Sequence, residues 1–175
     1  LMMSWVKDHL LIYLLIVILL GRALTNKKKI VFLTGTRADF GKLKSLINIS
    51  KKSKLFDVHI FVTGMHLDKK FGYTIDEVQK EGYDNIFPYK NYKLSSKMDQ
   101  ILANTIKGFS NYISDIKPDL IIVHGDRVEA LAGAISGSLN NILVAHIEGG
   151  EVSGTVDELI RHAVSKMSHI HFVSN

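Results

Sequence analysis

From Lys29 onward, short apolar runs alternate with segments of helical pattern, and this alternation constrains the fold more than any other feature of the chain. Such an alternation is typical of a parallel sheet whose strands are joined by crossover helices. The segments expected to be strands are 30–33, 58–62, 85–87, 120–123, 142–147 and 170–173, and the expected helices are 40–51, 74–81, a segment that follows Ser95 and stops at Lys117, 128–139 and 156–167. The sequence therefore predicts an α/β fold, a Rossmann-like parallel sheet with helices on both faces.

Three of these helices carry specific signals. Thr74 is followed three residues later by Glu77, which is the spacing of a capping box. The helix after residue 95 has an apolar stripe at spacing three and four, and it must end before Pro118, because the residue before a proline disfavours the helical region. The many small residues of 128–139 predict a helix that lies close against the sheet.

Length and composition indicate one globular domain. The chain has 175 residues, 46% of them hydrophobic and 22% charged, which suffices for one well-buried core. It has no cysteine, so disulfides and thiolate zinc sites are excluded and a cytoplasmic location is expected. The net charge of +5 comes with lysines scattered over separate segments, which indicates solvated surface and no nucleic-acid partner. No three ligands occur at a recognised metal spacing, so no catalytic metal is expected.

Residues 1–27 stand apart from the α/β pattern. They include an uninterrupted apolar run at 10–20, which is shorter than the roughly 18 to 20 residues that a spanning helix needs. A signal-peptide core, a membrane or interfacial anchor, and an appendage before a globular domain that starts near Thr25 all remain open. We expect a hydrophobic appendage over 1–27, a domain over 28–175, and membrane contact only through 10–20.

Acids, histidines and arginines follow two of the expected strands, in the segments 124–127 and 146–151. Because carboxyl ends of parallel strands meet at one edge, where open α/β folds bind ligands, this edge is the expected active site. Asp126 and Glu148 should lie on one rim, and paired acids suit proton transfer when burial and a like-charged neighbour move a pKa toward 7. The alternative is that Asp126 caps the following helix and Glu148 pairs with a lysine.

The segment 35–42 (GTRADFGK) joins the first strand to the first helix, where free N–H groups and the helix dipole attract a phosphate. Arg37 could clamp a diphosphate bidentately. The spacing matches neither the dinucleotide pattern nor the P-loop pattern, so an ordinary turn followed by a helix cap is the alternative.

Two couples of charged residues are four apart in the last expected helix. Asp157 can share a helix face with Arg161, and Glu158 can share one with His162, either as plain surface ion pairs or as part of the site. Three histidines, at 66, 124 and 146, stand at or just past strand ends, where a lone histidine is more often scaffold than acid or base.

Four segments taken together resemble the hydrolysing UDP-N-acetylglucosamine 2-epimerases of sialic acid biosynthesis. They are GTRADFGKL at 35–43, TGMHL at 63–67, KPDLIIVHGDR at 117–127 and HIEGGEVSGTVDELIRHAVSK at 146–166. The resemblance covers 28–175 and implies the N-terminal half of a two-domain fold like that of the B-type glycosyltransferases. It also implies a second domain past Asn175 that supplies much of the nucleotide pocket, so that this chain alone should be inactive. A UDP-sugar substrate, no cofactor, and a homodimer or larger assembly are further implications.

The reaction that the resemblance implies removes UDP from C1 and a proton from C2, and then adds water to the resulting 2-acetamidoglycal to give N-acetylmannosamine. The catalytic candidates are Asp126, Glu148 and Asp157. The substrate-binding candidates are Arg37, Lys42, Arg127, His66 and Arg161. One departure is Gly41, where some members carry a serine that touches phosphate.

Three alternatives stand beside this reading. The non-hydrolysing epimerases share the fold but usually read GTRPE and HVEAGLR, where this chain has GTRAD at 35–39 and HIEGGE at 146–151. Close relatives of the hydrolysing enzymes accept a 4-acetamido-6-deoxy UDP-sugar instead. A non-catalytic binding fragment is the third alternative.

Overall fold

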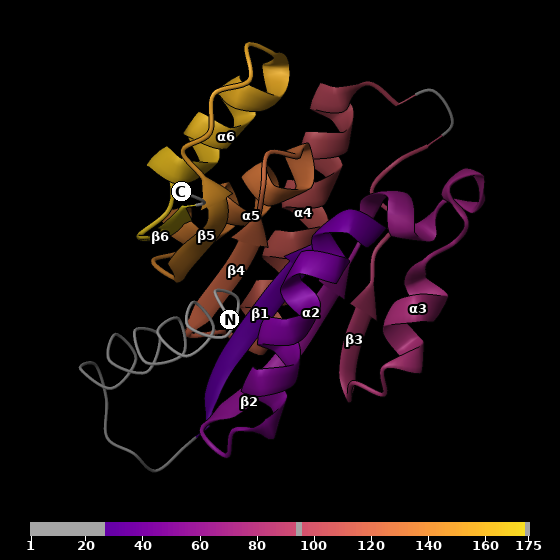
Figure 1. The fold of residues 1–175 in the computed structure, drawn as a ribbon, viewed down its shortest axis with the longest axis vertical. Helices are drawn as coiled ribbons and strands as arrows, with labels where there is room; N and C mark the ends of the chain where they lie inside the picture. The colour runs from indigo at the N-terminus through magenta and orange to yellow at the C-terminus, as the bar shows by residue number, and fades with distance from the viewer. Residues whose placement is uncertain (1–26, 94–95, 174–175) are drawn as a thin grey trace, which may run out of the picture.

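The computed structural model describes residues 27–93 and 96–173 (Figure 1). The strands are β1 (Lys28–Thr34), β2 (Phe56–Val62), β3 (Asn85–Pro88), β4 (Leu120–His124), β5 (Leu143–Gly149) and β6 (Ile170–Val173). The α-helices are α2 (Arg37–Lys52), α3 (Ile75–Lys80), α4 (Met98–Ile116), α5 (Val128–Leu139) and α6 (Val156–Lys166), and two short 3-10 helices, η1 (Gly64–Leu67) and η2 (Lys69–Phe71), follow β2.

All neighbouring strands of the sheet pair in parallel, in the order β3-β2-β1-β4-β5-β6. The order reverses between β1 and β4, and such a switch point opens a crevice at the carboxyl edge of an open sheet. The fold class expected from the sequence, a Rossmann-like sheet covered on both faces, is confirmed.

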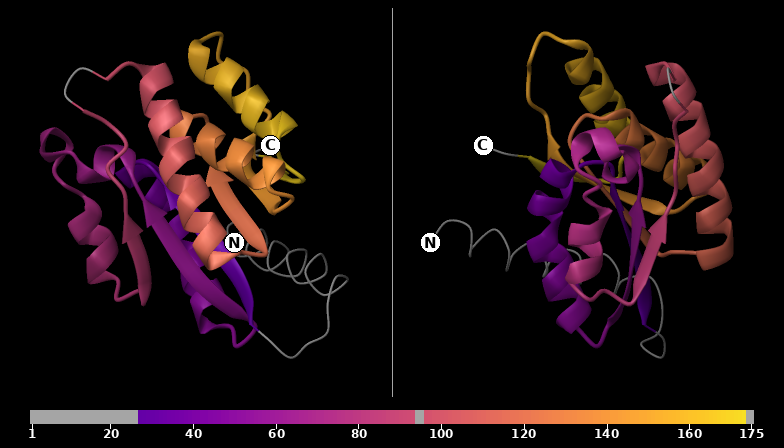
Figure 2. Two further views of the ribbon diagram at one scale, coloured as in Figure 1. Left: turned by 180° about the vertical axis from the view of Figure 1, so that it is seen from behind. Right: turned by 90° about the vertical axis from the view of Figure 1, so that its right-hand side faces the viewer.

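Each face of the sheet has its own core because side chains alternate along a strand. Ile30 and Phe32 of β1 pack with α2 and α3, whereas Val31 and Leu33 pack with α4, α5 and α6. The edge-on view in Figure 2 shows α2 and α3 on one side of the sheet and α4 on the other. The sheet is therefore the middle layer of a three-layer sandwich.

Helix α5 lies close against the sheet, as its small residues predicted. A Cβ atom added at Gly133 would lie 2.8 Å from Val123, and one added at Gly137 would lie 2.5 Å from Val144. The helix that follows Ser95 also ends where expected, because Lys117 leaves the helix with a φ of 53° directly before Pro118.

Two local expectations were wrong. Helix α2 begins three residues earlier than expected, because Thr36 caps it by accepting a hydrogen bond from the Asp39 N–H at 3.2 Å. The capping box at Thr74 does not form. Its hydroxyl instead hydrogen-bonds the Nδ1 atom of His66 at 2.8 Å, which ties α3 to η1.

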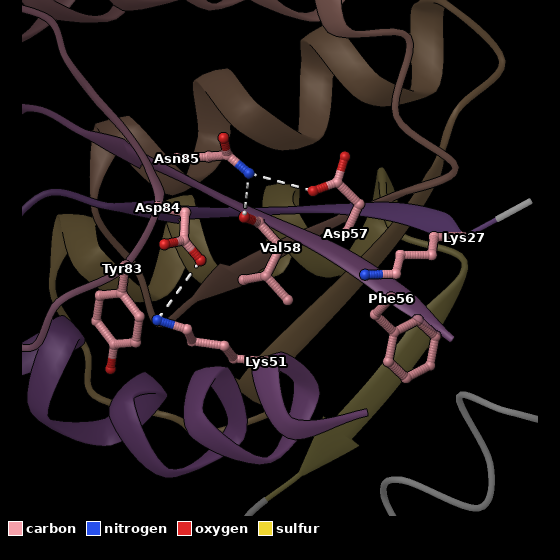
Figure 3. Close-up of a pocket in the computed structure, with 8 residues that line it drawn as sticks. All are labelled: Lys27, Lys51, Phe56, Asp57, Val58, Tyr83, Asp84 and Asn85. Atoms are coloured by element: carbon pink, nitrogen blue, oxygen red, sulfur yellow. Dashed lines mark hydrogen bonds and ion pairs between the residues drawn. The ribbon is translucent and has the colours of Figure 1, made fainter. Parts of the chain in front are cut away.

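One cavity of about 130 Å³ lies far from the carboxyl edge. Lys51, Asp57 and Tyr83 are among its lining residues, and it sits beside the amino ends of β2 and β3 (Figure 3). It is therefore not the site that the strand ends define. No helix in the described ranges is long and apolar enough to cross a membrane.

Candidate functional site at the carboxyl edge of the sheet

The carboxyl edge brings together side chains that lie far apart in the sequence. Lys42 of α2 reaches Glu148 at the end of β5, and the Nζ–Oε1 distance is 2.6 Å. Arg161 of α6 reaches Asp126 in the loop after β4. These two ion pairs flank the loops that follow β4 and β5, so the expected site forms one continuous rim.

Glu148 is held by groups from two other elements. Its second carboxylate oxygen lies 3.1 Å from Nε2 of His124, the last residue of β4, and Nδ1 of the same ring lies 3.5 Å from Asp39 of α2. Both contacts meet the distance of an ion pair but not the geometry of a hydrogen bond, since neither ring nitrogen has a hydrogen-bond partner. These contacts make a chain of neighbouring polar groups that runs from Asp39 through His124 and Glu148 to Lys42.

The pKa of Glu148 lies below its ordinary value, contrary to the expectation of a raised one. Partial burial favours the neutral acid, but the hydrogen bond from Lys42, together with the charges of His124 and Lys42, outweighs it. The hydrogen bond and charge of Glu148 in turn raise the pKa of Lys42. The alternative in which Glu148 pairs with a lysine is thus the observed arrangement, and the carboxylate is ionised at neutral pH.

Asp126 does not cap the next helix, because the N-cap of α5 is Arg127 and no side chain caps it. It pairs with Arg161, which is 6% exposed and also donates from Nη1 to the carbonyl oxygen of Glu151 at 2.8 Å. The expected couple of Asp157 with Arg161 was therefore wrong. Asp157 lies exposed in the first turn of α6, beside the loop that follows β5.

The second helical couple is present, since Nε2 of His162 lies 3.5 Å from Glu158. Glu158 also accepts hydrogen bonds from the N–H groups of Ser153 and Gly154. These backbone hydrogen bonds, followed by the contact with His162, lower its pKa. Glu158 thereby ties the loop that leads into α6 to the first turn of that helix, where the exposed Asp157 lies.

The basic candidates differ in how exposed their side chains are at this edge of the sheet. Arg37 is largely exposed in the first turn of α2, and its Nε lies 2.9 Å from Glu77 of α3. Arg127 is more sheltered and pairs through Nε with Glu129 at 3.3 Å. Lys42, Arg37 and Arg127 thus supply positive charge around the switch point, where an anionic ligand would be stabilised.

Two histidines are scaffold. His66 is fully buried, and its ring nitrogens are bonded to the hydroxyls of Thr34 and Thr74 at 3.0 and 2.8 Å. Burial lowers the pKa of His66 to about 4, so the ring is neutral. His146 is equally buried and bonds the carbonyl oxygen of Gly125 at 2.8 Å. Neither the His66 ring nor the His146 ring has a nitrogen free to contact a substrate. For His66 the geometry therefore favours a positioning role over direct contact.

Sequence reasoning missed Glu129, a carboxylate that is 3% exposed in the first turn of α5. It accepts a hydrogen bond from the Asn91 amide at 3.3 Å and lines a cavity of about 240 Å³ together with Arg127. One signal for it was available. A helix rich in alanine and glycine is expected to be covered on most sides, so an acid in its first turn is expected to be buried.

The fold and this rim together define the class as a Rossmann-like α/β domain with acids and bases at its switch point. Comparison with known proteins gives the family. The sequence profile described as UDP-N-acetylglucosamine 2-epimerase matches residues 48–175. The chain belongs to the UDP-N-acetylglucosamine 2-epimerase family.

Individual relatives agree with the profile. The UDP-N-acetylglucosamine 2-epimerase of Neisseria meningitidis serogroup B is 49% identical over 148 residues, which cover 85% of this chain and 39% of that protein. The hydrolyzing UDP-N,N'-diacetylbacillosamine 2-epimerase of Legionella pneumophila is 41% identical and covers 84% of this chain and 40% of that protein. The chain therefore spans about two fifths of the length of these relatives.

A solved structure supports the fold alone. The crystal structure of UDP-GlcNAc 2-epimerase from Neisseria meningitidis bound to UDP-GlcNAc matches with a TM-score of 0.74 at 24% identity. The match covers 83% of this chain and 39% of that chain.

Proposed function

We propose that this chain supplies the catalytic carboxylates of a hydrolysing UDP-N-acetylglucosamine 2-epimerase that serves sialic acid-type sugar biosynthesis. The observation that carries the proposal is the ionised Glu148, held between Lys42 and His124 at the same rim as the ion pair of Asp126 with Arg161. The resemblance of the strand-end motifs and the hydrolyzing relative at 41% identity support the hydrolytic branch.

In the proposed reaction the C2 proton of UDP-N-acetylglucosamine passes to a carboxylate while the C1–O bond breaks and its electron pair leaves with UDP. Water then adds across the double bond of the 2-acetamidoglycal, with its oxygen at C1 and a proton returned to C2 from the opposite face, and N-acetylmannosamine is released. An ionised Glu148 is competent to accept a proton. Asp126 and Asp157 are the other candidates for proton transfer and for stabilising the oxocarbenium-like charge at C1.

The departing diphosphate carries negative charge that positive side chains stabilise in the transition state. Arg37, Lys42 and Arg127 are the proposed contacts, and Arg161 acts by holding Asp126. A second domain, a homodimer or larger assembly, a cytoplasmic location, and an appendage over 1–27 belong to the same proposal. We propose no cofactor, and His66 enters only as a positioning group.

The test is to graft residues 28–175 into the Neisseria meningitidis serogroup B relative in place of its matching segment, and to supply UDP-N-acetylglucosamine in deuterated water. Release of UDP with free, C2-deuterated N-acetylmannosamine is the expected result. Formation of UDP-N-acetylmannosamine would instead place the chain in the non-hydrolysing branch. Glu148→Gln should abolish turnover in the graft, whereas the matched Glu81→Gln, whose carboxylate pairs only with Lys44 at 2.7 Å among the described residues, should not.

A second substrate is tested with the same graft. Because the Legionella pneumophila relative is described as acting on UDP-N,N'-diacetylbacillosamine, that sugar is supplied in parallel. A higher kcat/KM for it would move the proposed substrate to the 4-acetamido-6-deoxy class without changing the proposed chemistry.

A further inference from the structure

Glu129 sits where the loops that follow four strands meet. It is the second residue of α5, after β4, and its side chain packs against Gly35 after β1 and Gly64 after β2. Its Oε1 accepts from the Asn91 amide, in the segment after β3, and its Oε2 lies 3.3 Å from Nε of Arg127. A carboxylate is seldom this buried unless it is paired, so these contacts are what allow it to stay there.

The two glycines leave room for the carboxylate and no more. A Cβ atom added at Gly64 would lie 2.6 Å from Oε1 of Glu129 and 2.8 Å from the carbonyl oxygen of Gly35. One added at Gly35 would lie 3.2 Å from the Cγ and Cδ atoms of Glu129. The position of the carboxylate and the path of the two loops therefore determine each other.

The partner amide is itself fixed from α4. The Asn91 side chain donates to the hydroxyl of Thr105 at 2.8 Å, and its backbone carbonyl accepts from Asn104 at 3.1 Å. Asn91 is 1% exposed. Glu129 is thus anchored to α4 through Asn91, so its position does not depend on where Arg127 lies.

The contact through Nε determines how Arg127 is presented. Glu129 engages only the inner nitrogen of the guanidinium, and no hydrogen bond joins the two terminal nitrogens to any residue in the described ranges. The terminal nitrogens are the pair that bind an oxyanion bidentately, and the side chain keeps 39% exposure at the rim.

We infer that Glu129 is a positioning residue, which fixes Arg127 so that its two terminal nitrogens face the diphosphate of the nucleotide sugar. The inference rests on the proposed function, in which Arg127 is a diphosphate contact. It adds a residue that touches no substrate and acts through the arginine. The substrate group it serves is a pyrophosphate, which the UDP-sugars named above share.

The kinetic test uses the graft with Glu129→Gln, Arg127→Ala and both together. Glutamine keeps the shape but loses the charge, so KM for UDP-N-acetylglucosamine should rise roughly tenfold, the change expected for one charge-assisted hydrogen bond, while kcat stays within about threefold. The double variant should be no worse than Arg127→Ala, because removal of the arginine removes the route through which Glu129 acts. Additive losses, or a fall in kcat with unchanged KM, would overturn the inference. Glu81→Gln serves as the matched surface control.

A second measurement does not depend on turnover. In the 175-residue chain, the Nε–H of Arg127 should exchange with solvent slowly by NMR, and Glu129→Gln should speed that exchange at least several-fold. Equal exchange in the two proteins would overturn the positioning role whatever the kinetics show. An unmutated graft without epimerase products would count against the proposed function instead, so the two failures are distinguishable.

Discussion

Replacing Gly64 by alanine should destabilise the chain more than the same replacement at Gly82. Both glycines have left-handed backbone, with φ of 59° and 69°. No atom lies within 4 Å of a Cβ added at Gly82. At Gly64 the added atom would meet the Glu129 carboxylate at 2.6 Å and the Gly35 carbonyl at 2.8 Å. The pair therefore separates the cost of the backbone conformation from the cost of the collision.

The magnitudes follow from these two terms. A left-handed alanine costs about 1–2 kcal/mol, and roughly 0.4–1 kcal/mol returns because alanine restricts the unfolded chain. Gly82→Ala should therefore cost about 1 kcal/mol. Overpacking adds about 1–3 kcal/mol at Gly64, for a total of about 2–4 kcal/mol. In a chain of this size each 1 kcal/mol lowers Tm by about 2–4 °C.

Urea unfolding of the two variants and the unmutated chain measures both costs in one series. The m-values should agree, so that differences in midpoint report stability alone. If Gly64→Ala and Gly82→Ala unfold at the same urea concentration, the carboxylate of Glu129 does not occupy the space between the two loops. The same result would remove the geometric basis for its positioning role.

Three further perturbations test individual contacts. Lys42→Met removes the hydrogen bond and the charge that lower the pKa of Glu148, so this pKa should rise. The acid limb of the pH profile of kcat/KM in the graft should then move to higher pH. An acid limb that does not move would show that Glu148 is not the base. Arg161→Leu leaves Asp126 partly buried without its cation and should cost about 2–4 kcal/mol in urea unfolding, and a loss below about 0.5 kcal/mol would contradict the pairing. His66 has a folded pKa of about 4, below its ordinary 6.5, so the unfolded chain takes up the proton first and stability should fall as pH drops from about 6.5 to 4. On the order of 3 kcal/mol of that fall should be absent in His66→Gln, and an unchanged pH profile would contradict the buried neutral ring.

The regular elements could be predicted because their determinants are local. The apolar run before His124 and the stripe that ends at Pro118 are set by residues that neighbour each other in sequence, and both elements formed as expected. The 3-10 helix η1 was not predicted, because its residue His66 is held by buried hydrogen bonds with Thr34 and Thr74, one of which lies 32 residues away.

Site membership was more predictable than pairing. The carboxyl edge was expected to collect Asp126 and Glu148, because strand direction alone decides which residues stand at an edge. The partner of Arg161 was not predictable from spacing. Arg161 lies four residues from Asp157, yet it pairs with Asp126, which is 35 residues away. Spacing within α6 reveals only the neighbours along the helix, whereas this partner comes from the loop after β4.

At Glu148 the backbone conformation favours glycine, whereas the proposed function needs the carboxylate. Glu148 has a φ of 58°, a left-handed conformation that costs a residue with a Cβ roughly 1–2 kcal/mol, and it lies at an irregularity in the pairing of β5 with β6. Glycine would relieve that cost, but it would increase the freedom of the unfolded chain and remove the contacts with Lys42 and His124. Under the proposed function it would also remove the group competent to accept the C2 proton. A screen for heat resistance should therefore keep position 148 fixed.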